Sequence, residues 1–128
     1  MVLIDKNSVK LSDEQRYDLF MQNLMSERET WILTDEHGAV MLTENEEDYV
    51  PFWPTEETAS LWATDEWDHC QPKLISFDEL KDKWLPGMEE DDLCLIIFPT
   101  TQLTGQVFYP WEFNQVLDKK LTKLARKN

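Results

Sequence analysis

The chain is 128 residues long, and its 26 Asp and Glu residues against 12 Lys and Arg give a formal net charge of −14. A surface this negative repels phosphate, which excludes nucleic-acid binding through a basic face and disfavours anionic membranes. Hydrophobic residues make up 41% of the chain and aromatic residues 12%, so it is not a disordered acidic tail. The length predicts one domain that buries a core without disulfides or metals.

The apolar segments are short. Residues 1–4 are followed at once by charged residues, so we expect no secretion signal. The longest apolar run, Leu93–Phe98, is far shorter than the ~20 residues that a membrane helix needs. Cys70 and Cys94 could pair, but in a cytosolic protein they are more simply reduced thiols. We therefore expect a soluble, cytoplasmic protein.

Helical signals begin near the N-terminus. Residues 1–11 predict an irregular arm. Ser12 and Gln15 have the spacing of a capping box, in which the two residues satisfy each other's free amides at the start of a helix. Apolar side chains then recur on one helical face, which predicts a helix over 13–27: Tyr17, Phe20, Met21 and Leu24.

A hairpin follows this helix in the prediction. Residues 30–34 and 39–43 are rich in strand formers, and Gly38 suits the turn between them. Residues 49–53 are extended and aromatic. Because Pro51 has no amide hydrogen, this segment is predicted to be an edge strand or a strand end.

Two helices and a short strand come next. Residues 55–63 predict a short helix, and 73–75 a short strand. Ser76 and Glu79 form the clearest capping box in the sequence, and Pro86-Gly87 is predicted to stop that helix.

The last third of the chain predicts two strands and a helix. Leu93–Phe98 is typical of a central strand covered on both faces, and 106–109 of the strand that follows it. Pro110 suits the first turn of a final helix. That helix carries one apolar stripe: Phe113, Val116, Leu117, Leu121 and Leu124. Three tryptophans on predicted elements are interpreted as core or half-core residues: Trp31, Trp84 and Trp111.

The order of elements predicts the fold class. Hairpin joins between strands favour antiparallel pairing, and interleaved helices favour an α+β fold. We expect a mainly antiparallel sheet of four to six strands with three to four helices. These form a single compact domain over residues 12–128, after the arm at residues 1–11.

Three stretches resemble a known family. They are Val50–Pro54 with Ala59 and Trp67, then Pro72–Leu80 running into Lys83–Met88, and then Ile96–Pro99 with Gly105–Val107. Together they resemble the bacterial family of uncharacterised proteins named domain of unknown function 2750, over residues 12–125. The resemblance implies a small single-domain bacterial protein, and it supplies no catalytic residues.

Motifs for catalysis and metal binding are weak. Adjacent acids such as Glu46 and Glu47 are normally solvated and point apart. Asp68-His69-Cys70, even with His37, lacks the paired ligand spacing of zinc sites. With three glycines, the chain offers no phosphate-cradling loop. We therefore predict no metal, no cofactor and no catalytic residue, and we lean away from an enzyme.

A tryptophan cluster supplies the candidate binding residues: Trp53, Trp62, Trp67, Asp68 and His69. Aromatic rings rimmed by acid suit recognition of a basic, partly apolar partner. The simpler interpretation is that the rings complete a small core. The leading hypothesis is a protein-interaction module for a basic partner. The alternative is a small-ligand binder or enzyme with a pocket near Trp53, Trp67 and His69.

The charge is unevenly distributed along the chain. Residues 29–72 hold twelve Asp or Glu and no Lys or Arg, whereas residues 119–128 hold five basic residues and no acid. A basic protein is therefore the expected partner, with no nucleic acid and no membrane. The basic tail could fold back on the acidic region or lie head-to-tail with a neighbouring molecule. The oligomeric state is left open between a monomer and a homodimer, in which the edge near residues 49–53 could pair across the dimer axis although Pro51 opposes a long ladder.

Overall fold

The computed structural model describes residues 4, 6–101 and 104–127. Within these ranges it describes every side chain except those of Lys6, Glu66, Arg126 and Lys127. Parts of the predicted arm and of the basic tail thus lie outside the described residues. The helical elements are η1 (Lys6–Lys10), α1 (Asp13–Glu27), α2 (Glu56–Trp62), η2 (Asp65–Trp67), α3 (Phe77–Glu79), the π-helical η3 (Leu80–Trp84), α4 (Leu85–Glu90) and α5 (Pro110–Lys127). The strands are β1 (Glu29–Asp35), β2 (Gly38–Ala39), β3 (Leu42–Glu44), β4 (Glu47–Phe52), β5 (Gln71–Ser76), β6 (Leu93–Ile97) and β7 (Gln106–Phe108).

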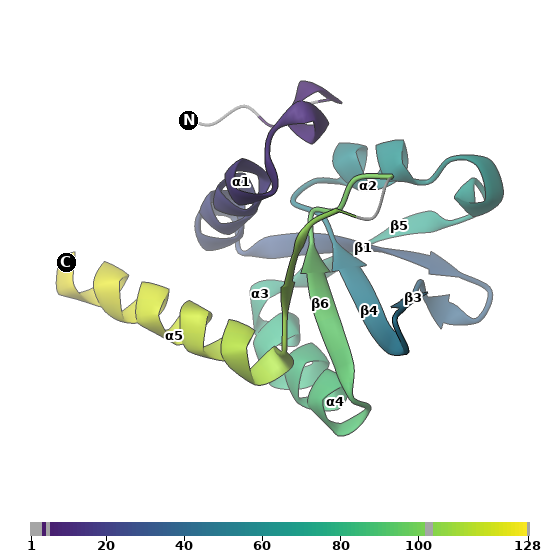
Figure 1. The fold of residues 1–128 in the computed structure, drawn as a ribbon. Helices are drawn as coiled ribbons and strands as arrows, with labels where there is room; N and C mark the ends of the chain where they lie inside the picture. Colours follow the sequence, from purple (N-terminus) through teal and green to yellow (C-terminus); the bar gives the residue numbers. More distant parts are fainter. Residues whose placement is uncertain (1–3, 5, 102–103, 128) are drawn as a thin grey trace.

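The strands form two sheets, ordered β2-β1-β5 and β3-β4-β6-β7 (Figure 1). The backbone groups of Trp31 in β1 and Trp53, just after β4, exchange hydrogen bonds of 2.9 and 2.8 Å, which join the two sheets. All pairings are antiparallel except that of β4 with β6. The predicted α+β class and the mainly antiparallel pairing are confirmed. The parallel pair was not predicted, and α2, β5 and α3–α4 form the crossover that it requires.

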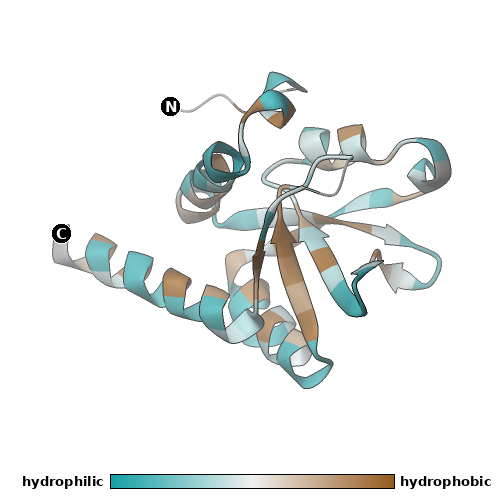
Figure 2. Cartoon of the chain, in the orientation of Figure 1, coloured by the Kyte–Doolittle hydropathy of each residue, from teal (hydrophilic) through white to brown (hydrophobic). Residues whose placement is uncertain are grey.

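Most of the predicted elements are confirmed. Helix α1 has the predicted bounds and capping box, and the capping box at Ser76 is also present. As predicted, β6 lies inside its sheet, between β4 and β7, and Leu95 and Ile97 are fully buried. In Figure 2 it is the most continuously hydrophobic strand. Helix α1 and the first half of α5 cover the core through Phe20 and Phe113, both at most 1% exposed.

The predicted strand at 39–43 is wrong, because it divides between the two sheets. Residues 38–39 pair with the end of β1, while Leu42–Glu44 pair with β4. The edge of β1 at Trp31 is already taken by Trp53, so β2 has room only beside Thr34 and Asp35.

The sequence predicts that Pro51 marks an edge strand or a strand end. Strand β4 is not an edge strand, since it lies between β3 and β6, but Pro51 is its second-last residue, so the strand-end alternative is confirmed. The carbonyl of Phe52 accepts a hydrogen bond from the amide of Phe98, after β6, whereas Trp53 bonds to the opposite side. Pro51 therefore faces the same side as Trp53. On that side β3 ends its pairing at Tyr49, so the missing amide hydrogen costs no ladder bond.

Pro86-Gly87 does not stop the helix, which continues to Glu90. The turn before it is π-helical, and the amide of Leu85 bonds to the carbonyl of Leu80, five residues earlier. A proline ring normally clashes with the carbonyl four residues before it, and the wider turn accommodates Pro86. No described helix is both long and apolar enough to cross a membrane.

Candidate functional site

The three tryptophans chosen from the sequence pack against one another in a row. The rings of Trp53 and Trp62 lie 5.4 Å apart, and those of Trp62 and Trp67 lie 5.5 Å apart, between centroids. Trp53 is 0% exposed and Trp62 is 4% exposed, whereas Trp67 is half-buried. The row therefore fills the space between α2 and the sheets, and Trp53 presents no ring face to an external molecule.

The neighbouring polar candidates do not form a catalytic arrangement. Asp68 and His69 are exposed, while the thiol of Cys70 is buried, 3.9 Å from Nε2 of His69. Burial raises the pKa of Cys70, and the charges of Asp35 and Asp68 raise it further. A raised pKa keeps this thiol protonated and a poor nucleophile. Among the described residues, no group of three or more His, Cys, Asp or Glu side chains could hold a metal.

Arg16 is a charged residue whose side chain is buried, with only 3% of its surface exposed. Its Nε donates to the carbonyl of Phe98 at 2.9 Å, and its Nη2 donates to the carbonyl of Thr104 at 3.0 Å. It also donates to the carbonyl of Leu11 and to the carboxylate of Asp13. Arg16, in α1, thus binds both the segment just before α1, at Leu11, and the loop after β6. A cavity of about 500 Å³ adjoins it. Because these bonds occupy most of the guanidinium donors, we assign Arg16 a structural role.

The acidic loops predicted to be separate converge on one cavity of about 500 Å³, here called the acidic cavity. Every charged side chain that lines it is a carboxylate: Glu46, Glu47, Asp48, Glu89, Asp91 and Asp92. The other lining residues are Leu93, Cys94, Tyr109, Pro110 and Trp111. The fold therefore brings acidic residues that are distant in the sequence into a single site.

The positions of β4, β6 and β7 explain why these residues meet. Strands β4 and β6 are parallel, so both begin at the same end of the sheet, with Asp48 beside Leu93. Strand β7 is antiparallel to β6 and therefore ends there, where α5 begins. The β3–β4 turn is a two-residue turn, Asn45-Glu46, in which both residues have positive φ (52° and 69°), as in a type I′ hairpin.

Two exposed aromatic rings line part of the acidic cavity. Tyr109 is 50% exposed and Trp111 is 51% exposed, and their rings are nearly parallel (6°), with centroids 6.4 Å apart. The interpretation of Trp111 as a core or half-core residue is therefore wrong. It lies in the first turn of α5, where Phe113 and Leu117 take the buried face and Trp111 points away from it. The sequence signal that was missed is the aromatic pair on either side of Pro110.

The charged side chains that line the acidic cavity all have the same sign, and several of them lie at the end of α4. Glu89 and Glu90 lie in the last turn of α4, which holds no basic residue, and Asp91 and Asp92 follow. The C-terminal end of a helix carries partial negative charge, so carboxylates there are repelled. Burial raises the pKa of Cys94, and the nearby charges of Glu47 and Glu112 add to the shift. A positive group entering the cavity would relieve this repulsion.

The fold and the acidic cavity define a small α+β protein with a surface pocket lined by carboxylates. The chain belongs to the family described as Protein of unknown function (DUF2750), whose model matches residues 17–117. This confirms the resemblance, over a somewhat shorter range than the expected 12–125. The acidic cavity lies wholly within the matched residues. Searches of the curated proteins and of the solved structures found no match.

Proposed function

We propose that this protein is a binding module that holds a basic segment of another protein in the acidic cavity. The observation that carries the proposal is the convergence of six carboxylates, from two loops far apart in the sequence, beside two exposed aromatic rings. The net charge of −14 steers positively charged surfaces toward the chain, and the acidic cavity is where that charge is concentrated around a hollow.

The chemistry of the acidic cavity suits Lys and Arg side chains that extend from a partner. Carboxylates pair with the ammonium or guanidinium group, and the faces of Tyr109 and Trp111 attract cations and cover the aliphatic stems. The volume of about 500 Å³ falls within the ~300–1,000 Å³ typical of ligand pockets. It is therefore large enough for one or two side chains of a partner.

The residues chosen from the sequence have secondary roles in this proposal. Trp53 and Trp62 stabilise the core, while Trp67, Asp68 and His69 lie at or near the surface and do not line the acidic cavity. The alternative of a pocket near Trp53, Trp67 and His69 has less support, because the Trp53 ring is fully buried and His69 is exposed. We favour binding over catalysis for this reason.

We further propose that the protein acts in the bacterial cytoplasm. The support is that Cys70 and Cys94 are both free and buried, which suits a reducing compartment.

A labelled octa-arginine peptide tests the proposal by fluorescence anisotropy, at low salt and at physiological salt. The site variant combines Glu46→Gln, Glu89→Gln and Asp91→Asn, three exposed residues that line the acidic cavity. We expect it to bind the peptide about tenfold more weakly, because several ion pairs are lost. Trp111→Ala should weaken binding about threefold through loss of the cation–π contact.

The matched control combines Glu27→Gln, Glu36→Gln and Asp82→Asn, which removes the same three charges from exposed positions that do not line the acidic cavity. It should bind almost as tightly as the unmodified protein. Equal weakening of the site and control variants would show that the peptide responds only to net charge, and the proposal would fail.

A further inference from the structure

The apolar stripe of α5 extends beyond the core that it helps to cover. Phe113 and Leu117, in the first half of the helix, are both 0% exposed. Leu121 is half-buried, and Leu124 is 40% exposed. Figure 1 shows the reason, since the C-terminal half of α5 runs outward past the sheets. The last turns of α5 therefore carry an apolar surface that this chain does not cover.

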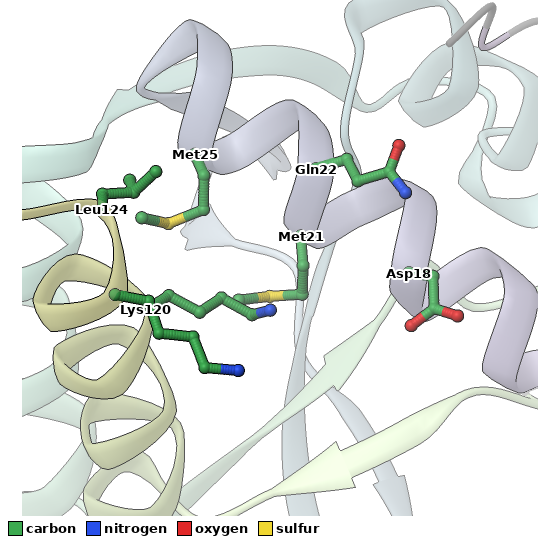
Figure 3. A pocket seen from close by; sticks show the side chains of 7 residues that line it. Asp18, Met21, Gln22, Met25, Lys120 and Leu124 are labelled. Atoms are coloured by element: carbon green, nitrogen blue, oxygen red, sulfur yellow. The ribbon is translucent and has the colours of Figure 1, made fainter. Parts of the chain in front are cut away.

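A groove of about 400 Å³, here called the helix groove, lies between this part of α5 and α1. Met21 and Met25 project from α1 toward α5, and Leu124 faces them from α5 (Figure 3). Methionine side chains are flexible and adapt to varied apolar surfaces, which suits them to an interface.

The two walls of the helix groove carry opposite charges. Asp18 and Gln22 line the α1 wall, whereas Lys120 and Lys123 line the α5 wall. Figure 3 shows Asp18 and Lys120 on their separate helices. Within the part of the chain that the structure describes, none of Asp18, Lys120 and Lys123 forms an ion pair. These charges are thus available to an incoming surface.

We propose that the helix groove is the interface of a symmetric homodimer, in which the Leu124 end of each α5 enters the groove of the other copy. A two-fold axis brings each surface against itself, so charged groups in the interface can pair only if the patch carries both signs of charge. The helix groove meets that requirement, because the lysines of one copy can face Asp18 of the other.

The overall charge distribution favours this surface over others for self-association. Two chains of net charge −14 repel each other, and the repulsion is least where basic residues gather. Five of the twelve basic residues lie in residues 119–128, whereas the acidic cavity lies at the opposite end of α5. At ~1.5 Å per residue, the 18 residues of α5 place the two ends about 27 Å apart, so the continuous helix cannot fold its tail back onto the cavity.

The experiment measures the mass of the full chain in solution by sedimentation equilibrium over a range of concentrations. We expect a monomer–dimer equilibrium. Leu124→Glu should raise the dimer dissociation constant at least about tenfold, because it places a charge in the apolar contact. Leu61→Glu is the matched control, since Leu61 is also 40% exposed and lies on another helix, α2. It should leave the equilibrium unchanged.

A charge exchange provides a second test. Asp18→Lys and Lys120→Glu should each weaken the dimer, and the double variant, which has the original net charge, should restore it. The proposal is overturned if the unmodified chain stays monomeric at every concentration, or if Leu61→Glu disrupts the dimer as much as Leu124→Glu does. It is also overturned if the double variant associates no better than the single ones. None of these results depends on whether the acidic cavity binds a basic partner.

Discussion

Replacing Arg16 by Met should destabilise the protein by about 3 kcal/mol. Methionine can fill much of the buried stem but donates no hydrogen bond, so three carbonyl groups lose a donor: those of Leu11, Phe98 and Thr104. A buried acceptor left unsatisfied costs about 1–3 kcal/mol. The bond to Phe98 is buried and the other two are part-buried. We therefore assign about 2 kcal/mol to the carbonyl of Phe98 and about 1 kcal/mol to that of Leu11. The carbonyl of Thr104 adds little, because it still accepts from the amide of Thr100 at 3.0 Å.

Urea unfolding, followed by tryptophan fluorescence, measures this change from the transition midpoint and the slope of the free energy with denaturant. A loss of this size is a large share of the ~5–15 kcal/mol that typical domains possess, so the midpoint should fall markedly. Asp13→Asn is the control, because the Asp13 side chain is 47% exposed and Asn keeps an oxygen that can accept from Arg16. It should cost no more than about 1 kcal/mol.

The reasoning would be refuted if Arg16→Met unfolded within about 1 kcal/mol of the unmodified chain, since that is the scale of an ordinary exposed ion pair. It would also be refuted if Asp13→Asn cost as much as Arg16→Met. That result would assign the stabilisation to the ion pair and not to the carbonyl groups.

Two further predictions follow from local geometry. Gly105→Ala should destabilise the fold by about 1–3 kcal/mol, because a Cβ there would lie 2.9 Å from the carbonyl oxygen of Ile97; a urea midpoint equal to that of the unmodified chain would contradict this. The thiols of Cys70 and Cys94 should react with iodoacetamide more slowly in the folded than in the urea-unfolded chain, because burial raises both pKa values and restricts access. The difference in rate between the folded and the unfolded chain should become smaller as the pH rises above the raised pKa values of the two thiols. Equal rates at neutral pH would contradict the raised pKa values.

Local signals predicted much of this fold. The capping boxes at Ser12 and Ser76 and the apolar run at Leu93–Phe98 each specify an element through neighbours a few residues away, and all three were predicted correctly. The error at residues 39–43, and the choice between an edge strand and a strand end at Pro51, have a different origin. There the outcome depends on which strand occupies the adjacent edge, and a sequence pattern does not contain that information.

The acidic cavity itself was not predicted. The sequence shows both acidic segments but predicts that they are separate and solvated, and it places the aromatic contact at Trp53, Trp62 and Trp67. The basic partner stays a prediction. Tryptophans on a buried face and on an exposed face look alike in composition, and the rotation of α5 decides that Trp111 is the exposed one. The convergence of the loops depends on the parallel pairing of β4 with β6, which hairpin signals do not suggest.

That parallel pairing also determines when the acidic cavity can form during folding. Strand β4 must wait for β6, which follows only after the whole crossover segment, and pairings between such distant residues form slowly. The aromatic part of the cavity lining, Tyr109 and Trp111, follows later still in the sequence. A chain emerging from the ribosome therefore exposes its acidic loops as separate, weakly attracting segments. The complete cavity needs the chain up to Trp111 and a closed second sheet, so the binding that we propose requires the folded chain.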